Sequence, residues 1–219
     1  MNWFTKNNQF FLQEQKSVAV LFPDLHYKVE GDNVYLVGSI HVDTKINDKK
    51  IYDSFRIQIL FPNEYPEFYP IVFEPSHKIP KSFHMNPNNS LCLGTELEIG
   101  MIFYQNRSIS NFIIHLLMPY LISFIYNRDY GVFPFGERKH GSDGKLEFYK
   151  ELFDITEISS IIKFLNAIKK EKLRGHQLCP CGSRKMFRNC HWSSAQKLLI
   201  IPKKLITQEI AYFQKLLNG

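Results

Sequence analysis

Apolar and polar residues alternate along several short segments in the first third of the chain. The alternating runs His26–Glu30 and Val34–Val42 flank the turn-forming residues Gly31, Asp32 and Asn33, so they predict a β-hairpin. Tyr52–Leu60 alternates in the same way, and Ile71–Phe73 is a short apolar run. Because these strands follow one another along the chain, we expect an antiparallel four-stranded meander sheet.

Helices are predicted on both sides of these strands. Residues Asn7–Leu21 place apolar side chains at loosely helical spacing. The apolar run Phe112–Tyr126 is shorter than the ~20 residues that a bilayer requires, and it contains His115 and Pro119. It therefore predicts a buried core helix rather than a membrane span, and the strands and helices together indicate an α+β fold.

The last third of the chain has a different character. Glycine punctuates residues 131–144, which predicts a loop. Asp154 and Glu157 are spaced as a capping box, and Gly175 is placed to end the helix that follows. We expect one domain at residues 1–150 and a helical tail at residues 151–219.

Composition narrows the class of protein. The chain has 219 residues, of which 44% are hydrophobic and 15% aromatic, as in a globular protein. Its amino terminus has no export signal, so a cytoplasmic protein is expected. Residues 151–219 contain 12 basic and 5 acidic side chains, a net charge of +7, whereas residues 1–150 carry −1. Any attraction to an acidic partner therefore belongs to the tail.

One cysteine, Cys92, stands apart from the other three in a polar run, Asn88-Asn89-Ser90-Leu91-Cys92-Leu93. The turn Phe61-Pro62-Asn63-Glu64-Tyr65-Pro66 precedes it, after the predicted helix and strands. This order of elements and motifs resembles a ubiquitin-conjugating enzyme fold over roughly residues 5–150. The chain resembles a divergent bacterial member, similar to conjugating components of antiphage defence operons that contain a nucleotidyltransferase making cyclic oligonucleotides.

The resemblance implies that Cys92 carries the carboxyl terminus of a protein as a thioester and passes it to an amine. We expect the carried protein to be a ubiquitin-like protein or a nucleotidyltransferase, and the chain either to need a separate activating enzyme or to act on an already activated species. The family's His-Pro-Asn signature is missing, and His84 stands where its Asn is expected. His84 and Asn86 are therefore both candidates to stabilise the oxyanion, with His84 also a candidate base. His140 lies in a Gly-rich loop of the kind that borders sites.

The other three cysteines lie in a short motif with one histidine, residues 179–191. Cys179, Cys181, Cys190 and His191 supply three soft sulfur ligands and one imidazole, which suit a tetrahedral zinc ion with no position left for water. The zinc is therefore expected to be structural. The motif resembles SEC-C, a sequence named from the SecA translocation ATPase.

Two other functions remain open. The first is a non-catalytic adaptor that has the same fold and uses the zinc segment to dock on a partner protein. Nucleic-acid binding is disfavoured because Phe187 and Trp192 are the only aromatic residues near the basic side chains of the motif.

Overall fold

The protein is described by a computed structural model that covers residues 3–136, 139, 141–171 and 173–218. The chain forms two compact units: unit 1 comprises Met1–Gly94 and Asn106–Glu137, and unit 2 comprises Thr95–Gln105 and Arg138–Gly219. The boundary predicted at residue 150 falls inside helix α6 (Gly141–Phe153). The ring of Tyr149 in this helix lies 5.2 Å from that of Phe213, so α6 is packed into the core of unit 2.

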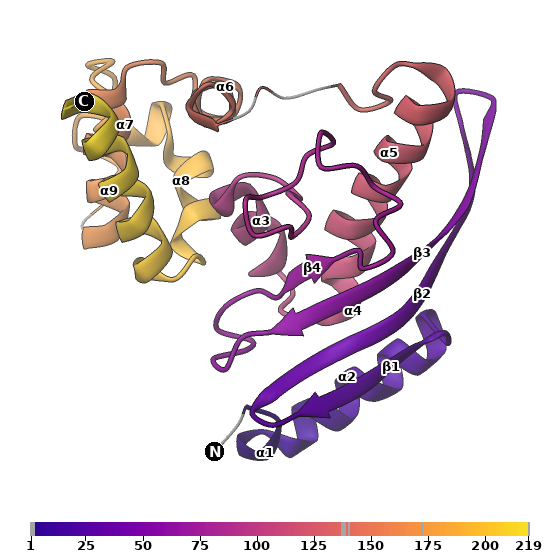
Figure 1. The fold of residues 1–219 in the computed structure, drawn as a ribbon. Coiled ribbons are helices and arrows are strands. Elements are labelled where there is room, and N and C mark those ends of the chain that lie inside the picture. Colours follow the sequence, from indigo (N-terminus) through magenta and orange to yellow (C-terminus); the bar gives the residue numbers. More distant parts are fainter. Residues whose placement is uncertain (1–2, 137–138, 140, 172, 219) are drawn as a thin grey trace. The chain divides into compact units, whose positions relative to one another are not determined.

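Unit 1 contains the predicted antiparallel meander, with the strands in the order β1-β2-β3-β4 (Figure 1). The strands are β1 (Leu25–Glu30), β2 (Asn33–Ile46), β3 (Lys49–Phe61) and β4 (Ile71–Phe73). Neighbouring strands pair antiparallel throughout. The four-stranded sheet is confirmed, and each predicted strand is found within a few residues of its expected bounds.

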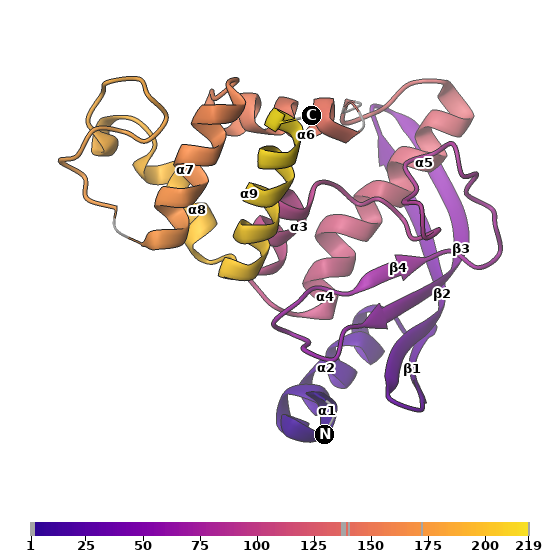
Figure 2. The same cartoon turned by 60° about the vertical axis from the view of Figure 1, so that its left-hand side comes forward.

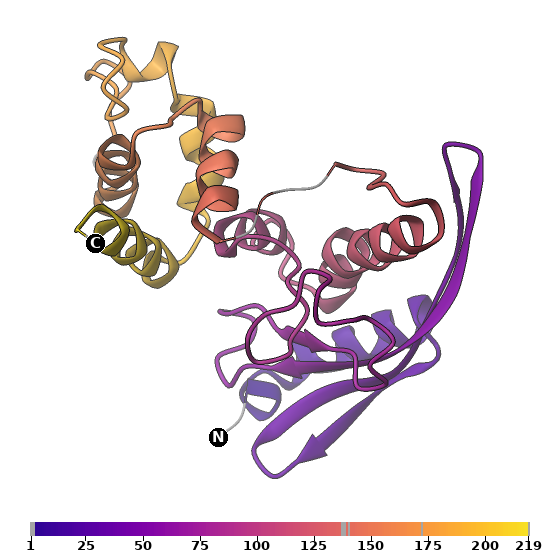
Figure 3. The same cartoon turned by 45° about the horizontal axis from the view of Figure 1, so that its top comes forward.

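The alternation in the sequence becomes the two faces of this sheet. Leu36 pairs with Ile59 and Ile40 with Phe55, and all four are buried. Their neighbours along the strands are more exposed. Helices α2 and α5 cover the apolar face (Figure 3), so the core of unit 1 lies between the sheet and these helices.

Two of the helices of unit 1, α4 and α5, are joined by a π-helical turn into one nearly continuous helix. The helices of this unit are α1 (Trp3–Lys6), α2 (Asn8–Leu21), α4 (Ile109–Phe112) and α5 (Met118–Tyr130), with a π-helical turn at Ile113–Leu117. Asn7 caps α2 by accepting a hydrogen bond from the Phe10 amide. The π turn lies just before Pro119, which has no N–H to donate to the His115 carbonyl.

Helix Ile109–Tyr130 is longer than the predicted run Phe112–Tyr126. Its 22 residues are long and apolar enough to cross a membrane by length and composition alone. However, 61% of its most apolar window is buried inside the protein. This burial is consistent with the predicted core helix.

Unit 2 is helical in the residues that the structure describes. It contains α3 (Glu96–Phe103), α6 (Gly141–Phe153), α7 (Ile158–Lys170), α8 (Trp192–Leu199), α9 (Lys203–Asn218) and a 3₁₀ turn at Phe187–Asn189. Figure 2 shows α7 and α9 side by side. The apolar stripe of α7 packs through Ile161, Leu165 and Ile168, which are buried together with Phe164.

Three predicted boundaries in unit 2 are wrong. Helix α6 begins at Gly141, inside the predicted loop 131–144. Asp154 has a φ of 49° and follows the end of α6, so the next helix begins only at Ile158. That helix ends at Lys170, before Gly175, where Glu171 takes the left-handed conformation. Burial of the aromatic side chains of α6 outweighs the low helix propensity of its glycines.

Candidate metal centre and candidate thiol site

The four predicted metal ligands come together at the start of α8. Cys179 and Cys181 lie on a tight turn, in which the Gly182 amide donates to the Cys179 carbonyl at 3.2 Å. Gly182 has a φ of 88°, a conformation that favours glycine. Cys190 follows the 3₁₀ turn and His191 precedes the first residue of α8. The fold therefore brings the two halves of the motif to the same place.

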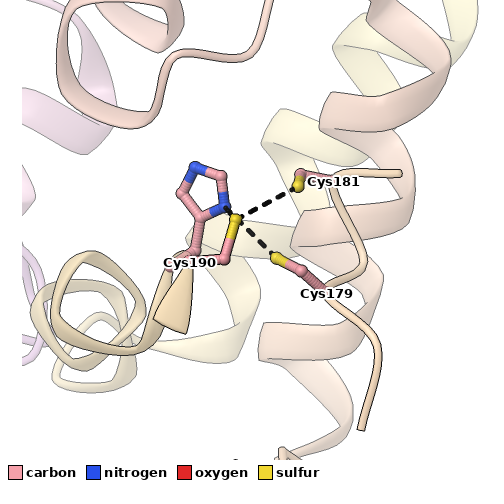
Figure 4. Close-up of side chains that lie close together, drawn as sticks. Cys179, Cys181 and Cys190 are labelled. Atoms are coloured by element: carbon pink, nitrogen blue, oxygen red, sulfur yellow. Dashed lines mark hydrogen bonds between the residues drawn. The ribbon is translucent and has the colours of Figure 1, made fainter. Parts of the chain in front are cut away.

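The side chains of Cys179, Cys181 and Cys190 point toward one another (Figure 4), and one ligand atom from each cysteine and from His191 lies within 4.8 Å of the others. The Sγ atoms of Cys181 and Cys190 are 3.7 Å apart. His191 Nδ1 lies 3.2 Å from Cys179 Sγ and 3.1 Å from Cys190 Sγ. In a regular zinc tetrahedron these separations are about 3.8 Å between sulfurs and about 3.6 Å between sulfur and nitrogen. The cluster fits a metal ion of this kind after small adjustments.

The orientation of His191 also suits metal binding. Its Nε2 atom is hydrogen bonded to the carbonyl of Phe153 at the end of α6. A carbonyl only accepts, so Nε2 carries the proton and Nδ1 presents its lone pair to the thiols. The ring is buried and lies 5.4 Å from the ring of Phe164. Helices α6 and α7 thus hold the imidazole in place.

The thiols differ in acidity. Burial raises the pKa of Cys179 to about 12. Burial acts in the same direction on Cys181, but hydrogen bonds with Ser183, Cys179 and Cys190 together outweigh it and lower the pKa of Cys181 to about 7. A divalent cation at the centre favours the thiolate form of each ligand, so it would oppose the effect of burial on Cys179.

Cys92 lies in unit 1 and is half-buried, with its backbone fixed. Its amide donates to the His84 carbonyl at 2.8 Å, and the preceding amide, of Leu91, donates to the Val72 carbonyl in β4 at 2.8 Å. The Tyr120 hydroxyl in α5 lies 3.1 Å from the carbonyl oxygen of Phe83 and 3.2 Å from that of His84. Strand β4 and helix α5 therefore anchor both sides of the loop.

The remaining candidates for the thiol site, Asn86, His84 and His140, differ in how they are placed relative to Cys92. The side-chain amide nitrogen of Asn86 donates one hydrogen bond to Ser90 Oγ at 2.9 Å and one to the Leu91 carbonyl at 3.3 Å. Both of its hydrogens are therefore used inside the loop. His84 and Cys92 meet through their backbones. Asn89, in the same loop, has a φ of 64°. His140 lies outside the described residues.

Two residues near these sites had no part in the sequence-based predictions. Tyr120 lies in an apolar run in which every aromatic residue is typical of a core, so it gives no separate signal. Ser183, whose hydroxyl contacts Cys181 and Cys190, follows the Cys-Pro-Cys-Gly segment directly, and its place in the motif was the available signal.

Comparison of this chain with protein-family models, with curated proteins and with solved structures finds no match.

Proposed function

We propose that this protein is a cysteine-dependent protein-conjugating enzyme, and that unit 2 carries a structural zinc ion. The observation that carries the enzymatic part is the position of Cys92: the residue is half-buried rather than enclosed, on a loop anchored at both Leu91 and His84. A nucleophile needs this combination of access and fixed geometry.

In the proposed reaction, the Cys92 thiolate attacks the activated carboxyl carbon of a donor protein. The donor's leaving group departs with its electron pair, and a thioester forms on Sγ. An amine of the acceptor then attacks the thioester, Cys92 departs as a thiolate, and the amine loses a proton as the amide forms. The donor is a ubiquitin-like protein or a nucleotidyltransferase, activated beforehand as a thioester or an acyl phosphate.

Of the two candidates for stabilising the oxyanion, His84 is the better supported. Asn86 commits both of its amide hydrogens within the loop, so it would have to break a bond before donating to an oxyanion. His84 is next to Cys92 through the backbone hydrogen bond.

A small acyl donor tests the proposal without knowledge of the natural one. Full-length protein is incubated with a glycylglycine peptide activated as a thioester of 2-mercaptoethanesulfonate, then with hydroxylamine or with a thiol such as dithiothreitol. Intact-mass spectrometry is expected to show one labile acyl group on the wild type, located at Cys92 by peptide mapping. Cys92→Ser is expected to give a stable ester and Cys92→Ala no adduct. Equal acylation of the wild type and Cys92→Ala would refute the proposal.

The zinc part of the proposal rests on the cluster Cys179, Cys181, Cys190 and His191. These residues would hold the ion with all four positions filled, so its role would be to stabilise the segment rather than to activate water. Elemental analysis of the purified protein is expected to give one zinc per chain.

One observation favours a second candidate, a non-catalytic adaptor of the same architecture. The amide of Asn86, one of the two candidate oxyanion donors, is occupied within its own loop. An adaptor would be acylated at Cys92 no faster than a free thiol such as glutathione, and it would not pass the acyl group to an added amine.

A further inference from the structure

The two sides of the Cys3His cluster differ in their surroundings. Cys179 and His191 are buried, whereas Cys181 and Cys190 are only half-buried. On the buried side, the Phe153 carbonyl orients the imidazole. On the exposed side, the residue in contact with both sulfurs is Ser183.

The hydroxyl of Ser183 lies between the two exposed thiols. Its Oγ is 3.1 Å from Cys181 Sγ and 3.2 Å from Cys190 Sγ. The Ser183 amide also donates to Cys181 Sγ at 3.4 Å. A single side chain is therefore in contact with half of the cluster's ligand atoms.

The direction of these hydrogen bonds follows from the partners of the hydroxyl. The Lys185 amide donates to Ser183 Oγ at 3.4 Å. A thiolate bound to a metal has no proton to donate, so the hydroxyl proton is directed to Cys181 or Cys190. Hydrogen bonds of this kind fix the rotamer of a ligand and spread its negative charge.

We propose that Ser183 is a positioning residue of the metal centre, whose hydroxyl contacts the Cys181 and Cys190 thiolates, donates to one of them and slows the loss of the metal. The inference rests on the proposed zinc site and is independent of the chemistry at Cys92. It assigns to Ser183 on the exposed side the role that the Phe153 carbonyl has on the buried side.

The test compares three variants of the full-length, zinc-loaded protein. Ser183→Ala removes the hydroxyl, Ser183→Thr keeps it, and Ser193→Ala removes an exposed hydroxyl from α8 as a matched control. Zinc release to 4-(2-pyridylazo)resorcinol is followed by absorbance. Ser183→Ala is expected to release zinc about 10-fold to 100-fold faster than the wild type, the usual effect of removing a partner of a metal ligand. Ser183→Thr and Ser193→Ala are expected to stay within about 3-fold of the wild type.

Cobalt substitution supplies a second readout. The thiolate-to-cobalt charge-transfer absorption is expected to have the same intensity in Ser183→Ala and in the wild type, because three thiolates still bind. Equal release rates for Ser183→Ala and Ser193→Ala would overturn the inference, as would loss of a thiolate band in Ser183→Ala. A wild-type protein that takes up neither zinc nor cobalt would overturn the zinc site itself, and the acylation of Cys92 would be unaffected by that result.

Discussion

A buried carboxylate, Glu14, joins helix α2 to the beginning of the long helix of unit 1. Only 3% of Glu14 is exposed. Its Oε2 atom accepts hydrogen bonds from the Tyr65 hydroxyl and from the amide of Ile109, the first residue of α4, both at 2.7 Å. Because the first amides of a helix have no partner within it, Glu14 satisfies a group that would otherwise be buried unpaired.

Two substitutions separate the hydrogen bonds from the charge. Glu14→Ala removes the acceptor to which the Tyr65 hydroxyl and the Ile109 amide donate, at about 1–3 kcal/mol for each bond, so we expect unit 1 to lose about 3–5 kcal/mol of stability. Both bonds end on one oxygen. The amide oxygen of glutamine has two lone pairs and can accept both, so Glu14→Gln is expected to cost less than about 1 kcal/mol.

The same residue predicts a pH dependence. Burial raises the pKa of Glu14 above its ordinary value of 4.5, against the lowering effect of the bonds from Ile109 and Tyr65. The folded state therefore holds this proton more tightly than the unfolded chain does. The stabilisation from this proton is fully present below pH 4.5 and is lost as the pH rises through the folded-state pKa. Above that pKa, Glu14 makes no further change to the free energy of unfolding. Relative to Glu14→Gln, which does not titrate, the wild type should become less stable over that range.

Fluorescence of Trp3 measures these changes in unit 1. Trp3 is buried and its ring lies 4.7 Å from that of Tyr65, and replacing Trp192 by Phe removes the other tryptophan. Urea unfolding in this background, with replacement of the exposed Gln13 of the same helix by alanine as a control, gives the free energies. A loss below about 1 kcal/mol in Glu14→Ala, or an equal loss in Glu14→Gln, would refute the reasoning.

Three further perturbations have defined outcomes. Asn89 has a φ of 64°, so Asn89→Gly should keep or raise stability and Asn89→Val should lower it by about 1–2 kcal/mol in urea titrations; equal stabilities would contradict the conformation. Lys145 Nζ lies 2.6 Å from the buried Glu209 and 2.7 Å from Glu96, so Lys145→Met should cost about 3–5 kcal/mol by calorimetry, and an unchanged unfolding temperature would exclude this role. Chelation of the metal should lower the unfolding temperature of unit 2 by calorimetry and leave the Trp3 transition of unit 1 in place; a shift in the Trp3 transition alone would place the effect elsewhere.

Patterns that act locally could be predicted from the sequence. The sheet follows from alternation, because a strand with one buried face places every second side chain in the core. The same alternation appears in the buried pairs Leu36–Ile59 and Ile40–Phe55. The grouping of the metal-ligand candidates follows from the spacing of Cys179, Cys181, Cys190 and His191, since a turn of a few residues is enough to bring them together.

Helix α6 shows where local patterns fail. Gly141 and Gly144 predict a loop, yet both lie in the helix. What stabilises the helix is packing at its other end, where Tyr149 and Phe153 are buried among rings from α7 and α9. The amino-acid composition of residues 131–144 carries no information about these contacts. Tertiary packing therefore overrides helix propensity in this segment.

The surroundings of Cys92 could not be predicted for a related reason. A sequence identifies which side chains are able to react, but hydrogen bonds decide which of them are available. His84 is the candidate by position and Asn86 its rival, and the sequence does not show that the side-chain amide of Asn86 donates to Ser90 and Leu91. Tyr120 reaches the loop from α5, more than 25 residues further along the chain, and nothing in its neighbourhood distinguishes it from a core aromatic residue. Pairing over such separations is set by the fold, so at Cys92 the chemical group was predictable and its partners were not.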